Sequence, residues 1–156
     1  MSAAPVPAVQ VSGLTKRFGS FTAIDDVSVT IQPGRIHGLL GRNGAGKTTL
    51  MQLITGQDFP SSGDIRVFGE NPAENARVLS HLCFIKESQR YPEDFQPKHV
   101  FRSAPWFFEH WDAEFAERLI EDFRLPVNRR IKKLSRGQLS AVGVIVGLAS
   151  RAPLTF

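Results

Sequence analysis

Residues 41–48 constrain the fold of this chain more than any other stretch, because two glycines stand five residues apart directly before a lysine and a hydroxyl residue. Glycines let a chain curl until successive backbone N–H groups point into one concavity, which suits phosphate oxygens. Lys47 can extend along the β- and γ-phosphates, and the Thr48 hydroxyl can take one position on Mg²⁺. The pattern predicts a nucleoside triphosphate site, whose contact residues are Gly41, Arg42, Asn43, Gly44, Ala45, Gly46, Lys47, Thr48 and Thr49.

The segments on either side of this loop have the composition that a phosphate-binding loop requires. Residues 35–40 are mostly apolar and are predicted to form a short strand. Residues 48–55 are predicted to form a helix that begins near Lys47 and stops at Gly56, with its positive dipole end toward the phosphates. The alternative is a glycine-rich turn between ordinary elements, but the order strand, loop, helix favours the phosphate site.

Composition limits the remaining possibilities. The chain has 156 residues, 42% of them hydrophobic and 22% charged, which indicates one globular domain with a real core. The net charge of +4 comes from scattered residues. The sequence has no basic stripe interleaved with aromatic residues, so nucleic-acid binding is not predicted. Cys83 is alone in an apolar run and is expected to be a small buried hydrophobe. Residues 139–149 are too short a run to span a membrane, so no crossing is expected.

The order of the other patterns indicates an α/β fold. Strands are predicted over residues 9–19, 27–31, 65–68 and 82–85, the last after the end of a helix. Residues 88–94 are a polar loop, and the segments that follow are helical. Asp112 is a predicted N-cap, before a helix whose apolar face carries Phe115, Ala116, Leu119, Ile120 and Phe123. A last helix is predicted over residues 139–150.

A second motif stands about ninety residues after the phosphate loop, at Leu134, Ser135, Arg136, Gly137 and Gln138. With that loop it resembles the ATP-binding cassette (ABC) family, the ATPase subunits of ABC transporters, over residues 9–156. The resemblance implies a P-loop NTPase (RecA-like) core with an antiparallel β part and a mostly helical insert that carries the signature motif. Residues 1–86 and 141–156 would be the nucleotide-binding core, and residues 87–140 the helical subdomain.

The resemblance also implies cofactors and partners. ATP and Mg²⁺ would bind, and two cassettes would dimerise head to tail on transmembrane permease subunits, at the cytoplasmic face of the cell membrane. Ser135, Arg136, Gly137 and Gln138 of one cassette would contact the γ-phosphate held by the other, as donors placed before a helix. The alternative for this motif is an N-cap serine before an ordinary helix. Phe18 matches the aromatic that stacks on adenine, with a core-packing phenylalanine as the alternative.

The chain departs from the family pattern in four places. Arg136 replaces the usual first glycine of the signature, which is not expected to abolish nucleotide contact, and the helix after it lacks the usual basic residues. The family's catalytic glutamine, which touches Mg²⁺, matches Glu87 by position; Gln89 lies two residues on, and we favour Gln89 because a neutral ligand adds no repulsion beside phosphate.

The fourth departure is that the sequence stops at residue 156, where a strand begins that in the family leads to a metal aspartate and a general-base glutamate. Taken alone, the chain is therefore expected to bind ATP weakly and to hydrolyse it negligibly. Two alternatives stay open: a non-transport cassette of the translation-associated kind, and a truncated cassette that binds nucleotide or a partner without hydrolysis. The family's switch histidine is not matched, and structural or surface roles are expected for His37, His81, His99 and His110.

The aromatic cluster in the predicted helical subdomain comprises Trp106, Phe107, Phe108 and Trp111. In the family this region faces the membrane subunit, so exposed rings here would form a docking site. Most of the rings are expected to pack in the core of the helical subdomain instead.

Overall fold

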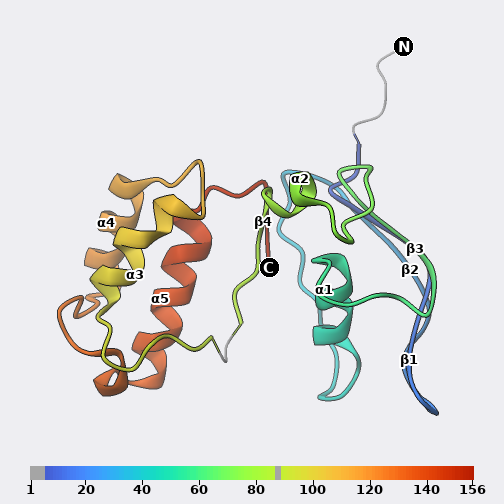
Figure 1. The fold of residues 1–156 in the computed structure, drawn as a ribbon, viewed down its shortest axis with the longest axis horizontal. Coiled ribbons are helices and arrows are strands. Elements are labelled where there is room, and N and C mark those ends of the chain that lie inside the picture. Colours follow the sequence, from blue (N-terminus) through green and yellow to red (C-terminus); the bar gives the residue numbers. More distant parts are fainter. Residues whose placement is uncertain (1–5, 87–88) are drawn as a thin grey trace. The chain divides into compact units, whose positions relative to one another are not determined.

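The computed structural model describes residues 6–86 and 89–156, which form two compact units, Met1–Ser80 and His81–Phe156 (Figure 1). Glu87 lies outside the described residues. The predicted division at residues 86/87 and 140/141 stays a prediction. Within the described ranges, no helix has the length and apolar character that a membrane crossing requires.

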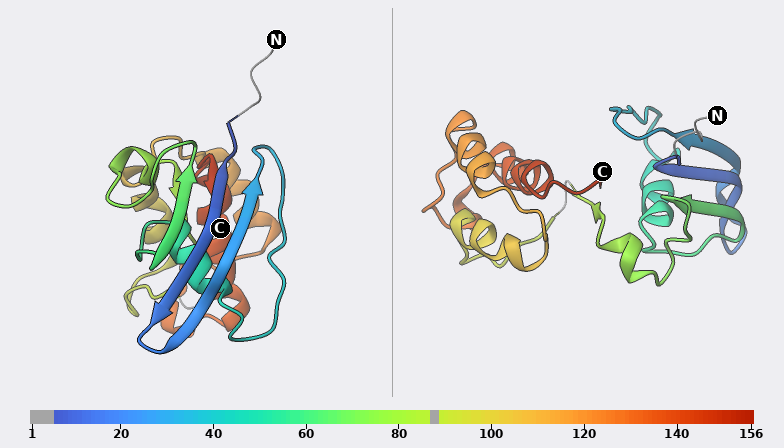
Figure 2. Two further views of the ribbon diagram at one scale, coloured as in Figure 1. Left: turned by 90° about the vertical axis from the view of Figure 1, so that its right-hand side faces the viewer. Right: turned by 90° about the horizontal axis from the view of Figure 1, so that it is seen from above.

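The first unit contains an antiparallel sheet with the strand order β2-β1-β3, formed by β1 (Val9–Phe18), β2 (Phe21–Ile31) and β3 (Ser62–Val67). The central strand buries apolar side chains, among them Val9, Val11 and Leu14. Helix α1 (Lys47–Ile54) lies against one face of the sheet and buries Leu53 and Ile54 (Figure 2). The predicted strands over residues 9–19 and 65–68 are confirmed, and β2 begins six residues before the predicted residue 27.

The prediction of a strand over residues 35–40 is wrong. This segment has no regular secondary structure, and the side chains of Ile36 and Leu40 are 104% and 92% exposed. A strand is stabilised by hydrogen bonds to a neighbouring strand and by burial of its apolar side chains. Among the residues that the structure describes, none pairs with this segment, so its apolar composition alone does not produce a strand.

The end of α1 is closed by the predicted glycine. Gly56 has a φ of 66° and donates its N–H to the Leu53 carbonyl at 3.1 Å, while the Gln57 N–H bonds the Gln52 carbonyl at 2.8 Å. These two bonds form a Schellman motif, which satisfies carbonyls that the helix leaves without partners. The segment after the helix therefore leaves in a defined direction and carries Asp58 back to the sheet. A short helix α2 (Ala76–Leu79), capped by Asn75, completes the first unit.

The second unit is mostly helical. Its elements are α3 (Pro97–Ser103), the 3₁₀ turn η1 (Ala104–Trp106), α4 (Ala113–Asp122), the 3₁₀ turn η2 (Ile131–Lys133) and α5 (Arg136–Ala149). Two short parallel strands, β4 (Leu82–Cys83) and β5 (Leu154–Thr155), pair with each other. The predicted strand after residue 81 is confirmed in part, because β4 spans two of its four residues. The predicted last helix is confirmed as α5, which starts three residues early.

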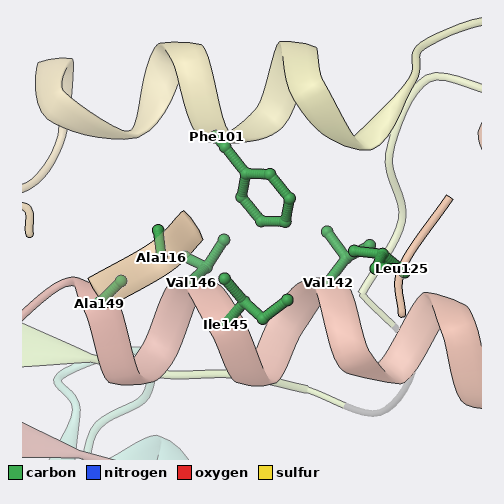
Figure 3. Packing of buried hydrophobic residues seen from close by; sticks show 7 residues of the cluster. All are labelled: Phe101, Ala116, Leu125, Val142, Ile145, Val146 and Ala149. Atoms are coloured by element: carbon green, nitrogen blue, oxygen red, sulfur yellow. The ribbon is translucent and has the colours of Figure 1, made fainter. Parts of the chain in front are cut away.

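The core of the second unit forms where α3 and α4 pack on α5 (Figure 3). Its buried residues are Phe101, Ala116, Leu125, Val142, Ile145, Val146 and Ala149. Asp112 caps α4 as predicted, since its Oδ1 accepts the Phe115 N–H at 2.9 Å. The predicted apolar face of α4 packs on this core except for Phe123, which is the C-cap of the helix and is 47% exposed.

Glycines in α5 let Ile85, which follows β4, pack close to the helix. A Cβ at Gly143 would lie 2.8 Å from Ile85, so the glycine leaves the space that Ile85 fills. Cys83 is buried as predicted, and this burial raises the pKa of its thiol.

The predicted aromatic cluster divides into two pairs. Phe108 and Trp111 pack against the core of the second unit, whereas Trp106 and Phe107 are 82% and 76% exposed. The expectation that most of the rings pack in this core therefore holds for two of the four.

Candidate nucleotide site

The phosphate loop lies between residue 41 and the start of α1, and its glycines adopt the backbone that the curl requires. Gly44 and Gly46 have φ values of 81° and 80°, and the Ala45 N–H bonds the Arg42 carbonyl at 3.1 Å. A Cβ at Gly46 would collide with the Ala23 carbonyl oxygen of β2. Only glycine therefore fits this position, both for its backbone conformation and for its close approach to the sheet.

Lys47 directs its ammonium group back over the loop. Its Nζ donates to the Gly41 carbonyl at 2.6 Å and to the Arg42 carbonyl at 2.8 Å. An ammonium group has three donors, so this position offers one more at the mouth of the loop. The lysine is thus held where a polyphosphate would meet both its charge and the backbone N–H groups of the loop.

The start of α1 suits an anion. No side chain of a described residue caps this helix, in contrast to the capped starts of α4 and α5, and its first turn contains no acidic residue. The partial positive charge of the helix start is therefore not neutralised by the helix itself. The Thr48 side chain is exposed here, and Thr49 is half-buried.

The residues present also fit Mg²⁺ held together with phosphate. Among the described residues, no group of three His, Cys, Asp or Glu side chains forms a metal site. Mg²⁺ in phosphate sites keeps several waters and needs few protein ligands, so the exposed Thr48 hydroxyl is a suitable single ligand.

Phe18 ends β1 beside this loop. Its side chain is 51% exposed, so it is not a core residue and the core-packing alternative is wrong. Phe18 pairs with Phe21 across the hairpin, and Gly46 meets β2 only two residues further on, at Ala23. The hairpin and the phosphate loop accordingly lie at the same end of the first unit in both Figures 1 and 2.

The signature residues form a capping box at the start of α5. The Ser135 Oγ accepts the Gln138 N–H at 3.2 Å, and the Gln138 Oε1 accepts the Ser135 N–H at 3.0 Å. Ser135 therefore acts as the N-cap that the alternative interpretation expected. Arg136 and Gly137 are exposed beside it, and a Cβ at Gly137 would meet no atom within 4 Å.

The two candidates for the metal-contacting side chain differ in what can be said of them. Glu87 lies outside the described residues. Gln89 is exposed, its N–H donates to the Lys86 carbonyl at 3.0 Å, and it lines an apolar cavity of about 370 Å³ in the second unit. The structure brings residues 41–49 together in the first unit and residues 135–138 together in the second.

Lys16 and Asp58 in the first unit, which bond each other, are not among the predicted site residues. Lys16 stands two residues before Phe18, and residues at this spacing point to the same side of a strand. That spacing was the available signal. The pairing with Asp58 was not predictable, because 42 residues separate the two side chains.

Comparison with known proteins gives consistent results. The ABC transporter family pattern matches residues 24–156. The chain is 48% identical over 155 residues to the spermidine/putrescine import ATP-binding protein PotA of Pseudomonas aeruginosa (strain UCBPP-PA14), covering 95% of this chain and 42% of that protein. It is 27% identical to the ABC transporter ATP-binding protein YtrB of Bacillus subtilis (strain 168), covering 94% of this chain and 50% of that protein. The chain thus spans about half the length of these curated relatives or less.

Solved structures agree on the fold. An ATP-binding subunit of an ABC transporter matches with a TM-score of 0.79 at 24% identity, covering 95% of this chain and 64% of that one. A dimeric ATP-binding cassette in a post-hydrolysis state, bound to ADP and Pi, matches with a TM-score of 0.76 at 19% identity, covering 94% and 72%. The P-loop NTPase fold of ATP-binding cassettes, predicted from the two motifs, is confirmed.

Proposed function

The chain belongs to the ABC transporter family, and from this membership we propose that it is the nucleotide-binding part of a transport ATPase. The observation that carries the proposal is the phosphate loop. It combines a helix start without a side-chain cap, a position that only glycine fits, and a Lys47 ammonium group that bonds the backbone of the loop. The relatives named above are ATP-binding proteins of transport systems. Their names favour transport over a translation-associated cassette.

The roles of the loop residues follow from their positions. Backbone N–H groups of residues 41–46 and the ammonium group of Lys47 bind the β- and γ-phosphates, and this fixed array of donors stabilises negative charge during phosphoryl transfer. Thr48 would hold Mg²⁺, which would neutralise charge on the phosphate oxygens. Phe18 stacks on adenine at the other end of the same nucleotide.

The signature acts on a second copy in this proposal. Gly137 has no positive φ, and no described residue would exclude a side chain there, so nothing in the described part of the chain requires glycine at this position. An exposed helix start with an unobstructed glycine suits the close approach of an external anion. We assign that anion as the γ-phosphate bound by the loop of a second cassette, with Ser135 and the Gly137 N–H as donors. The assignment of Gln89 or Glu87 as a metal-contacting side chain stays a prediction.

The partners and location follow from the same proposal. The second cassette and the transmembrane permease subunits are the partners, and the protein acts at the cytoplasmic face of the cell membrane. Relatives of similar identity are named for different cargoes, spermidine/putrescine at 48% and ribose in Rubrobacter xylanophilus at 46%. This agrees with a cassette that supplies energy while other subunits select the cargo.

Lys47→Ala tests the proposal in the protein at its full natural length. Removal of one preorganised donor from a developing charge lowers turnover by about 100-fold or more, so ATPase activity is expected to fall by at least that factor. Lys98→Ala, which removes an exposed ammonium group from α3 in the second unit, is the matched control and keeps normal activity. Unchanged ATP binding and hydrolysis in Lys47→Ala would show that the loop is not the nucleotide site.

A further inference from the structure

Lys16 lies directly against the aromatic ring that the proposed function assigns to adenine. Its Nζ is 4.8 Å from the centroid of the Phe18 ring, within the range of a cation–π contact. The same Nζ bonds Asp58 Oδ1 at 2.7 Å and the Phe59 carbonyl at 2.7 Å. Only 11% of the Lys16 side chain is exposed, so these contacts define its position.

The anchor of Lys16 comes from the segment that leaves the phosphate-loop helix. Asp58 and Phe59 follow the Schellman turn at Gly56, and the Phe59 N–H itself bonds Asp58 Oδ1 at 2.7 Å. The hydrogen bond from Lys16 lowers the pKa of Asp58, which favours the carboxylate form that accepts this bond. A continuous set of contacts therefore joins α1, which begins at the phosphate loop, to the Phe18 ring on β1.

We propose that Lys16 is a positioning residue for the nucleobase: it fixes the position and orientation of the Phe18 ring relative to the phosphate loop. It does not touch the nucleotide. The inference rests on the proposed function and adds to it a residue that governs the base contact and not the phosphate contacts.

The physical reason is preorganisation. Phe18 ends its strand and is half exposed, so without a contact on one side its ring would be free to rotate, and binding would have to order it. The ammonium group covers one side of the ring, and the exposed part is left for the base. A nearby cation also attracts electron density from the ring, which strengthens stacking of an electron-rich purine on the other side.

The test compares a ligand that has a base with one that has none. In the protein at full natural length, the affinities for ATP and for inorganic tripolyphosphate are measured in the wild type, Lys16→Met, Lys16→Arg and Phe18→Ala, together with KM and kcat for ATP. Lys16→Met is expected to weaken ATP binding and raise KM by about 5-fold, with kcat and tripolyphosphate binding unchanged. Lys16→Arg keeps a cation that can bond Asp58 and is expected to restore most of the ATP affinity.

Asp58→Asn provides a second route if Lys16→Met fails to fold, because it keeps the size of the anchor and removes its charge. It is expected to raise KM for ATP by about 2-fold in the same selective way. Thermal unfolding of each variant identifies a loss that is due to folding alone.

Three outcomes would overturn the inference. Equal weakening of ATP and tripolyphosphate would show that Lys16 acts on the phosphates or on the fold. Normal ATP affinity in Lys16→Met, together with a loss in Phe18→Ala, would show that the ring needs no positioning residue. Absence of ATP binding in the wild type would refute the proposed function, and the inference with it. In the other two outcomes the wild type binds ATP, so the failure of the inference alone can be distinguished.

Discussion

Helices α1 and α5 each begin beside a glycine and a hydroxyl residue, and the two glycines meet different surroundings. Gly46, before α1, has a φ of 80° and presses on the Ala23 carbonyl of the sheet. Gly137, in the first turn of α5, has no positive φ and faces open space. The first glycine is required by packing on the sheet, whereas no described residue requires the second, which in the proposed dimer faces a second cassette.

The hydroxyl residues differ in the same way. Thr48 is not a cap of α1, which has no side-chain cap. Ser135 caps α5 and is tied to Gln138 by two hydrogen bonds. The start of α1 is therefore left for a ligand, while Ser135 already bonds within its own helix start and, in the proposed dimer, also serves a second cassette. Substitutions can separate these situations.

Gly46→Ala should have the largest effect on stability. The new Cβ would collide with the backbone of β2 and the residue would have to adopt a left-handed conformation, so the free energy of unfolding is expected to fall by about 2–5 kcal/mol, with loss of ATP binding. Gly44→Ala is the matched control: it has a similar φ of 81° but no atom within 4 Å, so it should lose only about 1 kcal/mol. Denaturant unfolding measures both, and equal losses would refute the role of the Ala23 contact.

Ser135→Ala should have the next largest effect, because it removes the N-cap of α5. The expected loss is about 1 kcal/mol of unfolding free energy, together with reduced ATPase activity. Ser135→Asp restores the cap but places a carboxylate beside the proposed γ-phosphate, so stability should return and activity should not. Recovery of both would show that the serine is only a cap.

Gly137→Ala should change stability and activity in opposite directions. Alanine is favoured over glycine within a helix, so the free energy of unfolding should rise by about 0.5–1 kcal/mol. ATP binding at the phosphate loop should be unchanged, while hydrolysis falls because the methyl group obstructs a docked phosphate. A more stable variant with unchanged turnover would contradict the assignment of this helix start to a second cassette.

Asp112→Asn should have the smallest effect and a defined pH dependence. The Phe115 N–H, and then the Arg151 guanidinium at 2.7 Å, lower the pKa of Asp112 below its ordinary value of 3.8. A lowered folded-state pKa contributes stability above the unfolded pKa, and this contribution is lost as the pH falls through the folded pKa.

The midpoint difference between wild type and Asp112→Asn should thus shrink as the pH falls from about 5 to below the folded pKa. Asp122→Asn, at the other end of α4, removes the same charge without removing these contacts. A pH-independent difference for Asp112→Asn would show that the carboxylate charge does not contribute.

The features that could be predicted from the sequence are those that depend on residues close together in the chain, such as helix caps and the phosphate loop. Asp112 is predicted as a cap, Ser135 as a cap in the alternative interpretation of the signature, and Gly56 as a helix end, because each acts on atoms three or fewer residues away. The phosphate loop was predictable for the same reason, since its lysine bonds its own loop.

Features that depend on distant residues were not predictable from local patterns. Residues 35–40 have the composition of a strand, but a strand also needs a neighbour to pair with. Phe123 follows the helical period of α4, yet it is the C-cap of that helix and stays 47% exposed, outside the core on which the other members of the face pack. The contact of Lys16 with Asp58 joins residues that only the sheet and the turn after α1 bring together.

In the proposed dimer, the phosphate loop of one chain works with the signature of another. The decisive measurement is the ATPase activity of a mixture of two full-length variants with lowered activity, Lys47→Ala and Gly137→Ala. A mixed head-to-tail dimer contains one site with an intact loop and an intact signature, so ATPase activity should rise on mixing and should depend on the ratio of the variants. If both motifs served the same nucleotide within one chain, the activity of the mixture would be only the average of the two variants measured separately.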